Sequence, residues 1–409
     1  MSDNASATSA PPAASATTGS AAGPIIAIVF FNFVAYLAVG LPMAVVPGYV
    51  HGPLGYGEVV AGFAVSIQYL ATLLSRAYAG RLCDNHGPKR SVLSGMALCC
   101  ASGICLWIAG LSGLAPAGSL ASLIVGRLLL GTGESLVTTG TITWGIARAG
   151  SAHTGKVISW NGMTSYGGMA LGAPLGVLLA EHWGFGALGL TTVAMTLASW
   201  FLARRKPAVA PSGGERLPFS QVFRRMVPFG LCLALGSVGF GAISTFVTLF
   251  FASRHWPDAA LALTLLGAFF IAARLLFAGS INRFGGFPVA LVSFIVEASG
   301  LLLLWLAAAP WQAFAGAALT GFGFALVFPS LGMEAVRRVP SGNRGAALGA
   351  YALFLDLALG LTGPLAGVVA NRLGYASVFL LAALAVALAA MLSSVLHSMA
   401  GKGAAASAA

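Results

Sequence analysis

Long apolar segments separated by short polar ones make up nearly all of the chain after its first two dozen residues. A helix needs about 20 apolar residues to cross a bilayer. Twelve segments come close to or exceed that length: 25–46, 57–79, 91–113, 119–143, 156–180, 185–203, 227–251, 259–281, 289–309, 312–335, 346–370 and 375–398. The pattern predicts an all-α integral membrane protein with 12 transmembrane helices and both termini on one side.

The polar stretches divide this series of spans into two halves. Residues 1–23 are simple and polar, with Asp3 as their one acid, so we expect a disordered N-terminal tail. The longest internal polar stretch, 204–226, carries six basic residues and predicts a cytoplasmic linker. The domains expected are therefore an N-terminal six-helix bundle over 24–203, a C-terminal six-helix bundle over 227–398 and a C-terminal tail over 399–409.

Composition and charge exclude a soluble protein and orient the spans. The chain is 58% hydrophobic and only 8% charged, with a mean hydropathy of +0.90. Sixteen of its 21 Lys and Arg residues fall in loops on the side of the turn at 80–90, whereas Arg254 and Arg372 lie in the opposite loops. Basic loops stay in the cytoplasm, which predicts cytoplasmic termini. The net charge of +11 thus reflects topology and does not indicate nucleic-acid binding.

Several other chemistries have no support in the sequence. The five cysteines and six histidines do not show metal-ligand spacing, so we expect neither a metal site nor another cofactor. No phosphate-binding glycine-rich loop with lysine is present, which argues against ATP as the energy source. No nucleophile with a matching base suggests an enzyme.

An internal duplication is visible when the sequence is shifted by 190 residues. The shift superimposes, without a gap, the positions Gly131, Gly133, Arg148, Ser151, Gly155, Pro174, Leu175 and Gly184 on Gly321, Gly323, Arg338, Ser341, Gly345, Pro364, Leu365 and Gly374. Spans four and five therefore recur as spans ten and eleven. Parallel repeats of this kind predict two six-helix pseudo-repeats.

Two charged residues of span four have no counterpart in the second repeat. Arg127 and Glu134 correspond to Ala317 and Phe324. Charges at membrane depth are costly, so they line a water-filled path or find a partner. Seven residues separate the two along one helix face by about 10 Å, too far for a direct ion pair. Glu134 is the candidate proton carrier, and the alternative is a structural carboxylate bonded to nearby hydroxyls.

Three further charges fall within predicted spans. Arg274 and Glu297 lie at matching depths on consecutive antiparallel spans, which favours a structural ion pair over a role in transport. Asp356 lies about halfway across span eleven. Its open roles are binding a cationic substrate, carrying a proton and capping local polar groups. In the proton-coupled mechanism expected for this chain, Asp356 is grouped with Glu134 and Arg127.

A set of polar and aromatic residues could line a substrate cavity. Hydrogen-bonding side chains and ring faces suit a polar or mixed ligand. The candidates within the spans are Asn32, Gln68, Trp144, Asn161 and Tyr166. For Trp144 the alternative is a place in the aromatic belt at the membrane interface.

Two motifs in the first half carry a family resemblance. Gly80, Asp84, Gly87, Lys89 and Arg90 resemble the loop after the second helix of the major facilitator superfamily, which latches the two halves of a transporter together on the cytoplasmic side. The stretch 127–133, an arginine followed by glycines four and six residues later, resembles the fourth-helix motif of that family. The resemblance implies that Arg127 takes part in proton coupling.

Glycine–proline motifs on spans five and eleven extend the resemblance. Proline inside a helix removes a backbone hydrogen bond and bends it, and glycines beside it let another helix approach. The residues are Gly172, Pro174 and Gly176 on span five and Gly363, Pro364 and Gly367 on span eleven. They resemble the fifth-helix motif of the family's proton-coupled exporters.

The resemblance covers residues 24–400. The segments 40–42, 157–162 and 362–367 are most similar to the bacterial YhhS/YfcJ branch of the family. The resemblance implies a monomeric, multi-pass transporter of the bacterial inner membrane, with a small-molecule substrate, protons and the lipid bilayer as partners. The function expected is proton-coupled export (antiport) of a small organic compound by alternating access. Proton-coupled uptake by symport is the alternative within this fold, and a non-transporting membrane sensor or assembly factor is the alternative outside it.

Overall fold

The computed structural model describes residues 22–111, 113–150, 153–209, 219–277, 279–339 and 344–408. Every regular element of this part is a helix. The helices are α1 (Ala22–Met43), α2 (Val46–His51), α3 (Glu58–His86), α4 (Pro88–Ala109), α5 (Pro116–Ala149), α6 (Thr154–Trp183), α7 (Gly186–Arg205), α8 (Phe219–Ser253), α9 (Ala259–Leu276), α10 (Ser280–Phe284), α11 (Gly286–Trp305), α12 (Pro310–Phe324), α13 (Val327–Val336), α14 (Arg344–Leu373) and α15 (Tyr375–Ala408). The predicted all-α class is confirmed.

Twelve of the described helical segments are long and apolar enough to cross a membrane. The first span joins α1 and α2, and the tenth joins α12 and α13, each across a break of two residues. Large apolar side chains such as Leu74, Leu276 and Leu373 are 71–81% exposed, and an exposed apolar surface of this extent suits a lipid environment. The predicted number of spans is confirmed.

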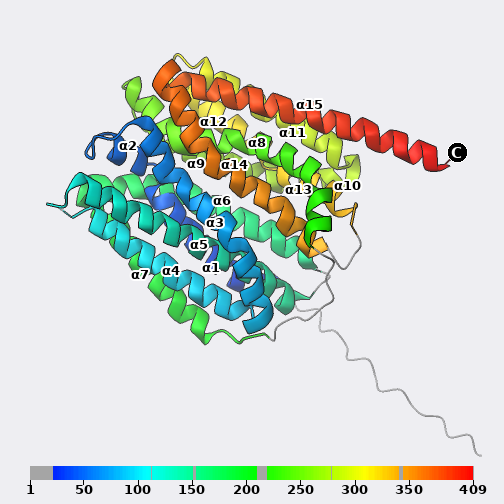
Figure 1. Cartoon of the computed structure of the whole chain (residues 1–409), viewed down its shortest axis with the longest axis horizontal. Helices are drawn as coiled ribbons and strands as arrows, with labels where there is room; N and C mark the ends of the chain where they lie inside the picture. The colour runs from blue at the N-terminus through cyan, green and yellow to red at the C-terminus, as the bar shows by residue number, and fades with distance from the viewer. Residues whose placement is uncertain are drawn as a thin grey trace, which may run out of the picture.

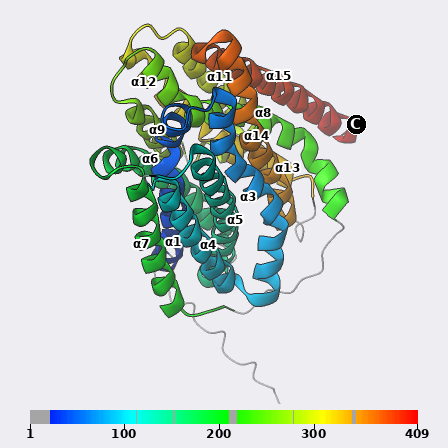
Figure 2. The same ribbon diagram turned by 60° about the vertical axis from the view of Figure 1, so that its left-hand side comes forward.

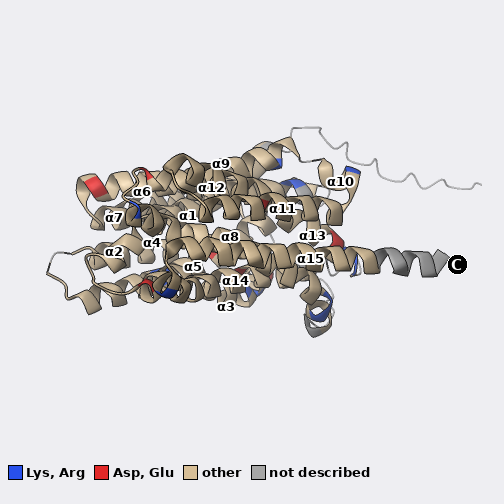
Figure 3. Cartoon of the chain, turned by 90° about the horizontal axis from the view of Figure 1, so that it is seen from above, with Lys and Arg blue, Asp and Glu red and all other residues tan. Residues whose placement is uncertain are grey.

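The helices form two bundles that lie side by side (Figures 1 and 2). The N-terminal half contains α1–α7 and the C-terminal half contains α8–α15. Across the boundary, α3 packs against α14 and α6 packs against α9. We call the end of the bundle where α1 starts the inner end, and the opposite end the outer end. Lys and Arg gather toward the inner end, from which α15 projects (Figure 3).

Close helix contacts repeat between the halves. A β-carbon on Gly131 of α5 would collide with the backbone of Gln68 on α3, and one on Gly321 of α12 would collide in the same way with Leu266 on α9. Because Gln68 and Leu266 make matching contacts, α3 and α9 occupy equivalent positions in the two repeats, and their residue numbers differ by 198. The same shift superimposes two helix-ending glycines with left-handed backbones, Gly87 and Gly285, both with φ of 86°. It also superimposes Arg76 on Arg274.

The turn predicted at 80–90 is much shorter than expected. Helix α3 continues through His86, and the chain reverses at Gly87 before α4 begins at Pro88. Gly80 lies within the helix and faces open space, so only Gly87 is needed for the reversal. The ammonium of Lys89 donates a hydrogen bond to the carbonyl of Arg204 (2.8 Å) at the end of α7, a contact within the N-terminal half.

The ends of the predicted domains differ from the observed helices. Residues 1–21 of the predicted tail and 210–218 of the predicted linker lie outside the described residues. The linker is bounded by α7, which ends at Arg205, and by α8, which starts at Phe219. Helix α15 runs on through the predicted C-terminal tail to Ala408. Its Ala-rich end favours helix, a propensity that the span pattern did not consider.

Candidate functional site

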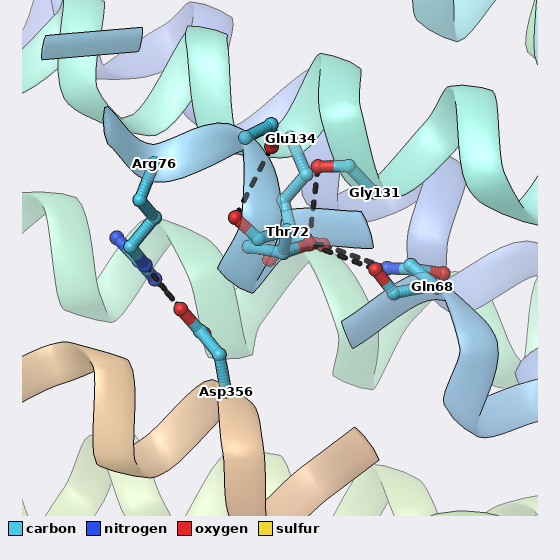
Figure 4. A network of polar contacts seen from close by, with 7 residues as sticks. Gln68, Thr72, Arg76, Gly131, Glu134 and Asp356 are labelled. Carbon is cyan, nitrogen blue, oxygen red and sulfur yellow. Dashed lines mark hydrogen bonds and ion pairs between the residues drawn. The ribbon is translucent and has the colours of Figure 1, made fainter. Parts of the chain in front are cut away.

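Glu134 is buried on α5 at the contact with α3. Its side chain is 3% exposed. The amide nitrogen of Gln68 donates to the carboxylate at 2.7 Å, and the hydroxyl of Thr72 lies 3.4 Å from the same oxygen (Figure 4). The one hydroxyl proton of Thr72 is shared with the carbonyl of Gly131, which lies at 3.0 Å. Glu134 is thus held by neutral donors and forms no ion pair with any residue that the structure describes.

Arg127 lies two helical turns outward from Glu134 on the same helix and is 2% exposed. Its Nη2 donates to the carbonyl of Val65 at 3.1 Å, whereas Nε and Nη1 have no partner among the described residues. A small cavity of about 10 Å³ adjoins the side chain and is lined by Ala38, Pro42, Ser102, Leu106, Leu123, Gly126, Leu130 and Thr192. That volume suffices for one water molecule.

Asp356 on α14 forms an ion pair with Arg76 on α3 (Figure 4). Arg76 Nε and Nη2 both donate to the carboxylate, the second at 3.0 Å to Oδ1. The Arg76 side chain is 19% exposed and the Asp356 side chain 4%. This pair joins the two halves of the molecule. The sequence interpretation left Asp356 open and assigned no role to Arg76, because the 198-residue equivalence that aligns Arg76 with Arg274 is visible only from the glycine contacts of the folded helices.

The predicted ion pair between Arg274 and Glu297 is wrong. The Nε of Arg274 instead donates to the carbonyl of Ala325 at 3.1 Å, and the guanidinium lies 4.9 Å from the centre of the Phe270 ring. Glu297 is fully buried, and its two oxygens have no partner in the part of the chain that the structure describes. The cause is the order of the helices, because α12 packs against both α9 and α11 and separates these consecutive spans.

Asn32 and Asn161 fasten three helices of the N-terminal half together. The amide nitrogen of Asn32 donates to Asn161 O (3.0 Å), to Thr164 Oγ1 (3.1 Å) and to Ser165 Oγ (2.9 Å). Thr141 donates to the side-chain oxygen of Asn161 at 2.9 Å. Both asparagines are at most 3% exposed. Their predicted place in the substrate cavity therefore gives way to a structural role between α1, α5 and α6.

The remaining predicted cavity residues lie in three different places. Gln68 binds Glu134 as described above. Trp144 is fully buried in the core of the N-terminal half, where its ring stacks on Phe31 with the ring centres 6.1 Å apart. This position differs from both expectations for Trp144, a substrate cavity and the aromatic belt at the membrane interface. Tyr166 lies at the boundary between the halves, where it stacks on Phe270 of α9 at 3.6 Å.

The halves are closed against each other at the outer end. The hydroxyl of Tyr375 donates to Glu58 at 3.3 Å, from the start of α15 to the start of α3. A β-carbon on Gly363 would collide with Gly62 and Ser66. Gly172 and Gly176, in the corresponding motif on α6, instead pack against α1 within their own half. Helices α6 and α14 both continue through their prolines, Pro174 and Pro364.

The comparisons with known proteins identify the family. The sequence profile of the Major Facilitator Superfamily matches residues 28–288 and 257–403. The chain is 54% identical over 386 residues to an uncharacterized MFS-type transporter of Burkholderia mallei (strain SAVP1), covering 93% of this chain and 95% of the relative. It is 55% identical over 375 residues to one of Pseudomonas aeruginosa (strain LESB58), covering 92% and 93%. The chain belongs to the major facilitator superfamily.

Solved structures agree on the fold. A D-xylose–proton symporter matches with a TM-score of 0.72 at 17% identity, over 90% of this chain and 97% of that one. The xylose transporter XylE from E. coli, in a partially occluded inward open conformation, matches with a TM-score of 0.71 at 15% identity, over 90% and 98%. Together with the family, these matches define a multi-pass membrane transporter and not an enzyme.

Proposed function

We propose that this transporter exports a small organic compound in exchange for protons, by alternating access of one site to the two sides of the membrane. The observation that carries the proposal is Glu134, a buried carboxylate held by neutral donors. Such a group can exist in either protonation state, because burial disfavours its charge while the hydrogen bonds from Gln68 and Thr72 stabilise it. Arg76, the partner of Asp356, lies one helical turn from Thr72 on α3.

The arrangement of the halves supports alternating access. The outer ends of α3 and α14 meet through Glu58 and Tyr375, and deeper in the bundle the same helices meet through Arg76 and Asp356. Both contacts lie between the two repeats, and in parallel-repeat transporters the halves rock about a central site. In this mechanism Arg127 tunes the proton affinity of Glu134, and the turn at Gly87 holds the inner end of the N-terminal half.

The orientation and the family branch belong to the same proposal. The basic loops at the inner end favour a cytoplasmic location for that end and for both termini, in a bacterial inner membrane. The segments 40–42, 157–162 and 362–367 favour the YhhS/YfcJ branch of the family. A monomer is the expected state. Proton-coupled uptake is the second candidate, because the two xylose transporters of the same fold include a proton symporter.

Proton movement in inside-out vesicles tests this function. The vesicles are energised to an acidic interior and exposed to sugars, organic acids and cationic drugs while a fluorescent dye reports the interior pH. We expect at least one compound to release protons from vesicles containing the wild type but not from those with Glu134→Gln. Glu181→Gln, a substitution of an exposed glutamate at the outer end, serves as the matched control and is expected to behave as wild type.

Three results would contradict the proposal. Proton release that is undiminished in Glu134→Gln would remove Glu134 from the proton path. Proton-driven movement of a compound out of the vesicles, from the acidic interior to the medium, would replace export by uptake. A response equal to that of vesicles without the protein, for every compound tested, would exclude proton antiport of these classes.

A further inference from the structure

The two contacts between the halves are related by the internal repeat, but their charges differ. Arg76 of α3 meets Asp356 of α14 in an ion pair. The 198-residue shift carries Arg76 to Arg274 on α9, and the 190-residue shift relates Asp356 to Tyr166 on α6. Helices α6 and α9 pack against each other just as α3 and α14 do. Where the first contact has a carboxylate, the second has the neutral phenol of Tyr166.

Arg274 is consequently a cation without a counter-charge. Its Nε is bound to the carbonyl of Ala325, and it forms no ion pair with any described residue. Glu297 is separated from it by α12 and makes no contact with it. The side chain is half-buried. A β-carbon at Gly162 of α6 would lie 2.7 Å from Nη1 of Arg274. The guanidinium therefore rests, through Nη1, against the backbone of the N-terminal half.

The surroundings of Arg274 are aromatic. Tyr166 stacks on Phe270, and its ring also approaches Phe240 (5.5 Å) and Phe324 (6.2 Å) edge-on. Arg274 lies over the Phe270 ring. The tenth span is broken between Phe324 and Val327, and this break supplies the Ala325 carbonyl that holds Arg274. Discontinuous helices at the boundary between repeats are typical of substrate sites in transporters.

We propose that Arg274 binds the carboxylate of a small, flat organic anion between α6 and α9, so that the ligand supplies the negative charge that Asp356 supplies at the equivalent contact. Because Nε is bound to Ala325 and Nη1 lies against Gly162, Nη2 is the donor of the guanidinium that faces a ligand carboxylate, and the Tyr166 hydroxyl can donate to the same group. The apolar part of the ligand lies against the aromatic cluster of Tyr166, Phe240, Phe270 and Phe324. This inference names the substrate class and rests on the proposed function.

The other charges between the halves do not favour a cationic ligand. Asp356 is neutralised by Arg76. Glu134 lies within the N-terminal half and accepts hydrogen bonds from Gln68 and Thr72. A cation placed beside Arg274 would be repelled, since two like charges at close range in a low-dielectric site oppose each other. The charge balance of this boundary therefore selects an anion.

Three flat ligands that differ mainly in charge test the inference: benzoate, benzamide and benzamidine. Binding to the purified full-length protein in detergent at pH 7 is measured by calorimetry and by thermal stabilisation. We expect benzoate to bind and stabilise, and the neutral and cationic analogues to bind at least about tenfold more weakly, because they lose the charge-assisted contact. Arg274→Gln is expected to weaken benzoate binding by at least about the same factor.

The matched control is Arg283→Gln, because Arg283 is exposed and its guanidinium also lies over a phenylalanine ring, that of Phe284, at 5.1 Å. It should bind benzoate as the wild type does. Absence of benzoate binding to the wild type, equal binding of benzamidine, or full affinity in a folded Arg274→Gln would overturn the inference.

A second measurement needs no variant of Arg274. Phenylglyoxal modifies accessible arginines, and peptide mapping by mass spectrometry of the wild type reports the modification at each position. Benzoate is expected to protect Arg274 but not Arg283, and equal modification of Arg274 with and without benzoate would contradict the site. Binding needs no proton gradient, so benzoate binding without proton movement in vesicles would refute the proposed antiport and leave this site standing.

Discussion

Replacing Asp356 with asparagine is expected to slow transport at least about tenfold. The substitution leaves Arg76 without its counter-charge at the boundary of the two halves. Removing one partner of a buried ion pair costs about 3–5 kcal/mol, and the 19% exposure of Arg76 reduces this cost. If the substitution destabilises the paired conformation by only about 1.4 kcal/mol, the equilibrium between conformations still shifts tenfold. Initial rates of substrate flux in proteoliposomes, at matched protein content, measure the effect.

The exchanged pair, Arg76→Asp with Asp356→Arg, separates a structural ion pair from a direct role of Asp356. If the pair acts by joining α3 and α14, the double variant should recover most of the flux that each single variant loses. A carboxylate that carried the proton or the substrate could not be moved to the other helix in this way. A wild-type rate in Asp356→Asn, or a double variant no better than the single ones, would refute the role of the pair.

Replacing Gly363 with valine is expected to abolish transport by keeping the outer end open. A β-carbon there would overlap the Gly62 carbonyl and the Ser66 side chain on α3, and the Gly62 backbone cannot move aside without separating α3 from α14. The equilibrium should therefore shift toward the state that is open at the outer end. Ser66, which is 1% exposed in the closed arrangement, provides a reporter when it is replaced with cysteine.

The matched control for this substitution is Gly349→Val on the same helix. A β-carbon at Gly349 meets no atom within 4 Å, so the control tests the β-branched side chain without the collision. Impermeant maleimide should label Ser66→Cys in intact cells faster when Gly363 is valine, and at the unmodified rate when Gly349 is valine. Unchanged labelling together with normal transport in Gly363→Val would show that the close contact at Gly363 is not needed.

The fold could be predicted from the sequence because its determinants are local. Apolar segments of about 20 residues are sufficient to define spans, and the gapless repeat of glycines and prolines related the two halves. The boundaries were less accurate at 80–90, where a single left-handed glycine, Gly87, makes the reversal and α3 extends through the expected loop. Hydropathy alone does not show how far a helix continues beyond the apolar core.

The site could be predicted only in part, because it depends on which helices become neighbours. Burial of Arg127 and Glu134 follows from their place within a span, and their lack of a mutual ion pair follows from the helical rise. The partners of Arg274, Glu297 and Asp356 do not follow from the sequence. Arg274 and Glu297 lie on consecutive spans, α9 and α11, that α12 separates, whereas Asp356 meets a residue of the distant helix α3. The 198-residue equivalence of α3 and α9 was recognisable only from their matched glycine contacts.

The most direct test of Glu134 as the proton carrier compares two kinds of transport in proteoliposomes. Exchange of labelled for unlabelled substrate needs no net proton movement, whereas uphill transport driven by a pH gradient does. With the compound that the vesicle assay identifies, Glu134→Gln is predicted to retain exchange and to lose gradient-driven transport. Loss of both to the same extent, or retention of both, would contradict the account.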